Sequence, residues 1–74
     1  MITSTQCRMA RAAVKLTVDD LAQAAQVGRS TVIRFERGAI VLPAIKAAIK
    51  SAFERTGLQF ENDGGVVPPG EEAR

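Results

Sequence analysis

Apolar residues recur three and four positions apart in the first third of the chain, in two segments that each follow a capping signal. The first segment predicts a helix over 4–14, where Thr3 and Gln6 have the spacing of a capping box. The second predicts a helix over 18–25, because Thr17 is followed three residues later by an Asp. Two short helices in close succession are therefore expected.

Two more helices follow, each bounded by residues that suit a helix end. The third is predicted over 29–37, with Gly28 as its cap and Gly38 placed to end it in the left-handed conformation. The fourth starts at Pro43, whose missing N–H costs nothing there, and is closed by Gly57. Its apolar positions keep a regular helical spacing at Ile45, Ala48, Ile49, Ala52 and Phe53.

The pattern changes after the fourth helix. Residues 58–60 alternate apolar and polar, residues 62–65 have turn chemistry, and two valines follow. We expect 58–67 to form a short β segment, which either folds back as a hairpin or pairs with a second chain, and we favour the pairing. Residues 68–74, with Pro-Pro-Gly and charged positions, are expected to be a disordered tail.

Composition narrows the classes of function. A chain of 74 residues makes one small domain, and with 4% aromatic residues its core must be built from aliphatic side chains. The absence of His and the single Cys exclude zinc sites of the Cys/His type, Ser-His-Asp triads and an internal disulfide. With no long apolar run and no signal-like segment, we expect a cytoplasmic protein that touches no membrane and needs no cofactor.

The net charge of +2 conceals an asymmetry. Residues 1–60 hold nine Lys and Arg against four Asp and Glu, a net of +5, whereas residues 61–74 carry a net of −3. A basic body favours an anionic partner such as nucleic acid.

Residues 18–37 have the layout of a helix-turn-helix. Its crossing helices need a small residue at their contact, Ala22, and its turn needs a buried apolar residue, Val27. Between them Gln26 stands where the chain often takes a positive φ. The outer face of the second helix carries residue types that suit the DNA major groove: Arg29, Ser30, Ile33, Arg34 and Arg37.

The segment "TVDDLAQAAQVGRSTVIRFERG" resembles the helix-turn-helix of the lambda-repressor/Cro (XRE-type) family. The likeness extends over about 2–56 and implies a mostly α, four-helix, lambda-repressor-like domain over 1–57. In that family the second motif helix reads DNA. By position, the resemblance implies base contacts by Arg29, Ser30, Ile33 and Arg34, and backbone contacts by Thr31 and Arg37.

The resemblance also implies a structural pair. Members often join an Arg of the first helix to a Glu near the end of the recognition helix, here Arg11 and Glu36. Three positions depart from the family pattern. Val18 replaces a Gln that braces the recognition helix on DNA, while Gln26 and Lys15 stand where Gly is common.

Several residues have alternative interpretations. The arginines of 29–37 also fit a merely solvated helix face, and Ile33 fits either a thymine methyl or packing against the loop 39–42. Asp19 and Asp20 suit a helix start, or a contact with RNA polymerase. Cys7 is expected to be a small core residue.

The sequence thus predicts a DNA-binding regulator of transcription that acts as a homodimer on double-stranded DNA, without catalysis, metal or small-molecule substrate. The alternative is a protein-interaction module that contacts RNA polymerase or a toxin partner, with DNA binding secondary.

Overall fold

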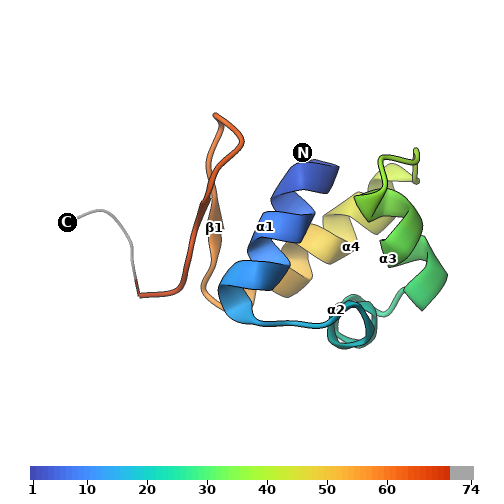
Figure 1. Ribbon diagram of the computed structural model, residues 1–74, viewed down its shortest axis with the longest axis horizontal. Coiled ribbons are helices and arrows are strands. Elements are labelled where there is room, and N and C mark those ends of the chain that lie inside the picture. Colours follow the sequence, from blue (N-terminus) through green and yellow to red (C-terminus); the bar gives the residue numbers. More distant parts are fainter. Residues whose placement is uncertain (71–74) are drawn as a thin grey trace.

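The computed structural model describes residues 1–70 of the 74-residue chain. Four helices form one body and a small hairpin lies beside them, at the opposite end of the long axis from α3 (Figure 1). The elements in chain order are α1 (Ser4–Val14), α2 (Val18–Ala25), α3 (Arg29–Glu36), α4 (Pro43–Glu54), β1 (Gln59–Phe60) and β2 (Val66–Val67). The mostly α, four-helix fold is as predicted. Residues 58–67 fold back on themselves as a hairpin, which was the less favoured of the two forms expected.

The helix starts are those that the capping signals predicted. Thr3 accepts the backbone N–H of Gln6, and the Gln6 side chain accepts the N–H of Thr3, each at 3.1 Å. Thr17 and Asp20 form the same reciprocal pair at the start of α2. Each pair satisfies N–H groups that have no partner within the helix.

Two helices end earlier than predicted. Arg37 is the C-cap of α3 and lies outside the helix, and Gly38 then takes φ 93°. α4 ends at Glu54, three residues before Gly57. The hydroxyl of Thr56 donates to the carbonyl oxygen of Phe53 at 2.6 Å, and the backbone there turns with shorter-range bonds than an α-helix has.

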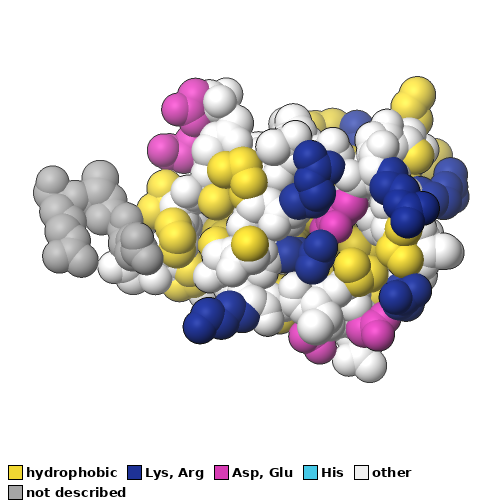
Figure 2. All heavy atoms as spheres, viewed as in Figure 1, with side chains coloured by type: hydrophobic (Ala, Val, Ile, Leu, Met, Phe, Trp, Pro, Cys, Tyr) yellow, Lys and Arg dark blue, Asp and Glu magenta, His cyan; other side chains and the backbone are white. Residues whose placement is uncertain are grey.

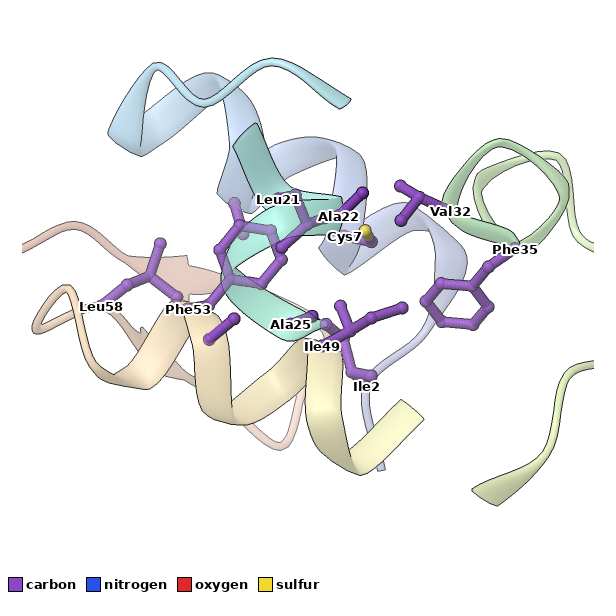
Figure 3. Close-up of a cluster of buried hydrophobic side chains, with 12 residues drawn as sticks. Ile2, Cys7, Leu21, Ala22, Ala25, Val32, Phe35, Ile49, Phe53 and Leu58 are labelled. Atoms are coloured by element: carbon purple, nitrogen blue, oxygen red, sulfur yellow. The ribbon is translucent and has the colours of Figure 1, made fainter. Parts of the chain in front are cut away.

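Side chains from all four helices meet in one core (Figure 3). Leu21 of α2, Val32 of α3 and Ile49 and Phe53 of α4 are buried together, with Cys7 of α1 beside them. Leu58, just before β1, closes the cluster at the hairpin end. Aliphatic residues fill most of this core, so the small aromatic content is enough.

The hairpin is packed on the helices. Its strands are antiparallel, with Phe60 opposite Val66, and both residues pack against the core. The Phe60 ring meets Phe53 edge-on, with 6.0 Å between ring centroids. The amide nitrogen of Gln6 also donates to the carbonyls of Glu61 and Gly65. A two-stranded hairpin is marginal alone, so these contacts hold it.

The predicted tail 68–74 is only partly within the description. Residues 71–74 lie outside the described residues. Pro69 lies 3.4 Å from the position that a Cβ on Gly57 would take, so the chain still borders the helical body at that residue. None of the helices within residues 1–70 combines the length and the apolar character that a membrane crossing needs.

Candidate nucleic-acid interface

The turn between α2 and α3 fixes the angle at which α3 leaves the body. Gln26 takes φ 58°, a left-handed conformation that a side chain makes costly. The next residue returns its backbone N–H to the carbonyl of Ala22 at 3.0 Å. Gly28 then takes extended dihedrals and starts α3 as its N-cap. The positive φ predicted for Gln26 is confirmed.

One side of α3 is held by the core. Val32 and Phe35 are buried, and Ala22 of α2 is also buried, which allows the two helices to approach closely. Val27 is half-buried, whereas the sequence predicted a buried residue in the turn. It packs against the core from the turn between α2 and α3, and the rest of its side chain is open to solvent.

The opposite side of α3 faces solvent and is cationic. Three of its side chains are exposed, those of Arg29, Ser30 and Arg34, and Arg37, directly after the helix, is exposed too. Thr31 and Ile33 are half-buried. We name this set of six residues the outer face of α3. In Figure 2 dark blue side chains gather at the end of the molecule that α3 occupies in Figure 1.

A hollow lies beside the loop 39–42. It bears on whether Ile33 packs against this loop or is free to contact a thymine methyl group. It is lined from α3 by Thr31 and Arg34, and from the other side by loop residues and the start of α4. Ile33 is not among its lining residues. Half-buried on the outer face, Ile33 keeps part of its side chain toward solvent.

Arg29 has an intramolecular partner that the sequence analysis missed. Its Nε lies 2.7 Å from a carboxylate oxygen of Asp19, in the first turn of α2. The two side chains are 65% and 71% exposed, so the pair is weak and easily screened. Arg29 can therefore exchange this carboxylate for a phosphate at little cost. No sequence spacing indicates such a pair, because the α2–α3 turn brings it together.

A partly buried ion pair joins the carboxyl end of α3 to α1. Arg11 and Glu36 meet in a two-pronged contact, with Nε to Oε2 at 2.6 Å and Nη2 to Oε1 at 2.8 Å. Their side chains are 24% and 9% exposed. The thiol of Cys7, in the core as predicted, donates to the same Oε2 at 3.2 Å. Such a fork fixes both distance and direction.

The protonation states of this cluster follow from its contacts. Burial raises the pKa of Glu36, but hydrogen bonds from Arg11 and Cys7 lower it more, and the net pKa is below its ordinary value. Burial raises the pKa of the Cys7 thiol strongly, and its bond to Glu36 raises it further. The hydrogen bond to Glu36 raises the pKa of Arg11. At neutral pH the pair is charged and the thiol is protonated.

Arg8 makes a second connection between α1 and the end of α3, which the sequence analysis also missed. Its guanidinium donates to the backbone carbonyl of Glu36, one of the last carbonyls of α3, and to the hydroxyl of Thr5. A cation suits that end of a helix because the helix dipole is negative there. The only sequence signal is the spacing of Arg8 and Arg11, which places both on one side of α1.

A comparison with known families decides what this arrangement is. A family model described as helix-turn-helix matches residues 8–52, more than half of the chain. The chain belongs to the lambda-repressor (XRE-type) helix-turn-helix family. The comparison with curated proteins found no match.

Membership of this family bears on the chemistry of the outer face of α3. The helix-turn-helix domain is that of DNA-binding regulators of transcription. Its second helix projects from the body, and the major groove of B-DNA is about 12 Å wide, enough for one helix. Here α3 projects with buried residues behind it and cations in front.

Proposed function

We propose that this helix-turn-helix protein binds specific double-stranded DNA sites as a homodimer, with the outer face of α3 in the major groove. The observation that carries the proposal is the division of α3 into a buried side and an exposed cationic side. Arginine forks match guanine edges and phosphates, and these contacts release counterions from DNA.

The residues of the outer face divide into two roles. Arg29, Ser30 and Arg34 lie exposed where base edges would be reached, and the open part of Ile33 suits a thymine methyl group. Arg37, just past the helix, and Thr31, beside the loop, suit the sugar-phosphate backbone. Val18 at the start of α2 brings no amide group, so bracing of α3 falls to Arg11, Glu36 and Arg8.

A homodimer is part of the proposal because one helix reads few base pairs. Two copies related by a two-fold axis read two half-sites, one helical turn apart. A domain of this size also exposes much of its surface, and association is a common way to stabilise it.

Selection of bound duplexes from a random pool, followed by footprinting, tests the proposal. The wild-type chain is expected to enrich a two-fold symmetric site, protected at two positions separated by about 10 base pairs. Arg34→Ala should enrich no site or one with a changed base preference. Enrichment of no duplex by the wild-type chain in dilute buffer would overturn the proposal and favour a protein-interaction module.

A further inference from the structure

Arg29 differs from the other two arginines of the outer face of α3. Of the three, it alone forms an ion pair with a carboxylate among residues 1–70, that of Asp19. Asp19 lies in the first turn of α2, and Arg29 is the first residue of α3. In a helix-turn-helix the first residues of the second helix contact base edges, and the first helix crosses the DNA backbone. In the proposed complex the pair therefore lies close to both bases and phosphates.

The ion pair occupies one side of the Arg29 guanidinium. Oδ1 of Asp19 lies 2.7 Å from Nε of Arg29. A guanidinium holds its N–H groups in a fixed planar fork, so a partner at Nε leaves the end with Nη1 and Nη2 pointing elsewhere. That end matches N7 and O6 of guanine in the major groove, which arginine contacts with two hydrogen bonds. Arg29 can thus keep Asp19 and contact a guanine at the same time.

Asp19 has no part in the cap of α2. Thr17 caps that helix and exchanges hydrogen bonds with Asp20. The side chain of Asp19 is largely exposed, and its ion-pair partner within residues 1–70 is Arg29. The charges of both aspartates suit the positive end of the helix dipole, so Asp20 is a natural control for Asp19. The contact with Arg29 is what distinguishes the two.

Building on the proposed function, we propose that Asp19 is a positioning residue for base reading: it holds the Nε side of Arg29, turns the Nη end toward a guanine and disfavours a contact between Arg29 and a phosphate. The pair is weak in the free chain, but docking on DNA removes water from around it and strengthens the attraction. A phosphate contact would instead separate the pair and leave the Asp19 carboxylate beside the anionic backbone of DNA. Asp19 thereby raises the preference of Arg29 for a base.

Asp19→Asn tests the proposal, because it removes the charge and keeps the size of the side chain. Asp20→Asn is the matched control. It removes the same charge from the same helical turn, and its amide oxygen can still accept the N–H of Thr17. Selection from random duplexes with Arg29→Ala identifies the base pair that Arg29 reads. The probes are the duplex selected by the wild-type chain, the same duplex with that base pair replaced, and an unrelated duplex of equal length.

In anisotropy titrations, Asp19→Asn should lower the preference for the selected duplex over the replaced one by about threefold, the scale of an exposed ion pair. It should raise affinity for the unrelated duplex by about twofold, because a charge that repels phosphates is gone. Asp20→Asn should keep the wild-type base preference. In the Arg29→Ala background, Asp19→Asn should leave the base preference unchanged, since the residue through which it acts is absent.

Other results would overturn the proposal. An unchanged preference in Asp19→Asn, an equal loss in Asp20→Asn, or equal weakening of binding to all three probes would each contradict it. A change of preference by Asp19→Asn in the Arg29→Ala background would show that Asp19 acts on DNA directly.

The same experiments separate this inference from the proposed function. If the wild-type chain selects a site but Arg29→Ala changes the preference at no base pair, the inference fails and the proposed function stands. Selection of no duplex by the wild-type chain would contradict the proposed function itself, and this inference with it.

Discussion

Gln26 stores backbone strain at the turn on which the placement of α3 depends. It takes φ 58°, and Lys15, at the end of α1, does the same. Both were noted from the sequence as positions where Gly is common. A side chain there costs about 1–2 kcal/mol relative to ordinary dihedrals, and the rest of the fold must hold the turn against that cost.

Gln26→Gly is therefore expected to raise the free energy of unfolding by up to about 1 kcal/mol, because Gly adopts positive φ freely. Gln23→Gly is the matched control. It lies within α2 and is exposed, so the same change should lower stability by roughly 0.5–1 kcal/mol. Urea denaturation of both variants measures the difference. Equal destabilisation by the two changes would show that the strain is absent.

Glu36 links stability to pH. Its pKa is lowered in the folded chain, against about 4.3 for an unperturbed Glu. Its contribution is therefore full above that value and is lost as pH falls through the lowered pKa. Glu36→Gln should cost roughly 2 kcal/mol at neutral pH, since Arg11 loses its charged partner.

Urea denaturation of the wild-type chain and Glu36→Gln at pH 7 and near pH 3 checks this. The stability difference between the two proteins is expected to shrink at the lower pH. A difference independent of pH would mean that Glu36 is not held as an anion by Arg11 and Cys7.

At the scale of elements, local chemistry predicted most of the fold. The capping boxes at Thr3 and Thr17, the proline at α4 and the glycine after α3 are signals within a few residues, and the structure confirms each. The ends of α3 and α4 were less accurate, because Arg37 and Thr56 make local bonds that replace the last helical turn.

Contacts between elements could not be predicted in the same way. The bond from Arg8 to Glu36 and the pair of Arg29 with Asp19 depend on how α1, α2 and α3 cross. The pairing of Arg11 with Glu36 was expected from the family resemblance, and no local spacing suggested it. The family resemblance therefore predicted the site residues, whereas their contacts could be found only from the packed fold.

Gln6 connects the start of α1 to the hairpin. A substitution that keeps its acceptor and removes its donor tests the two connections separately. Its side-chain oxygen serves the start of α1, and its nitrogen holds the hairpin through Glu61 and Gly65. Gln6→Glu keeps the acceptor for α1 but has no donor for the hairpin carbonyls. We expect faster amide hydrogen exchange in β1 and β2, with a loss of about 1–3 kcal/mol in stability.

The exchange of α1 amides should change little in this variant, which makes them the internal control. Hairpin amides that exchange as in the wild-type chain would show that Phe60 and Val66 alone hold the hairpin against the helices.

The whole molecule separates its charges, with a net of +5 over residues 1–60 and −3 over 61–74. In the proposed complex, cations on the outer face of α3 make DNA affinity depend on salt. Arg37→Ala should weaken binding to all sequences alike and reduce the slope of log affinity against log salt concentration by about 1 per copy. Titrations at several salt concentrations measure it. An unchanged slope would mean that Arg37 contacts no phosphate.

The affinity of Arg34→Ala for the selected duplex tests the central claim most directly, with Arg55→Ala as the control. Both variants lose one exposed arginine, but Arg55 lies at the end of α4 and donates to the carbonyl of Ala24. By fluorescence anisotropy we expect Arg34→Ala to lose about tenfold to a hundredfold in affinity, and Arg55→Ala to stay within about twofold of wild type. Equal losses of affinity in the two variants would contradict the claim that the outer face of α3 reads DNA.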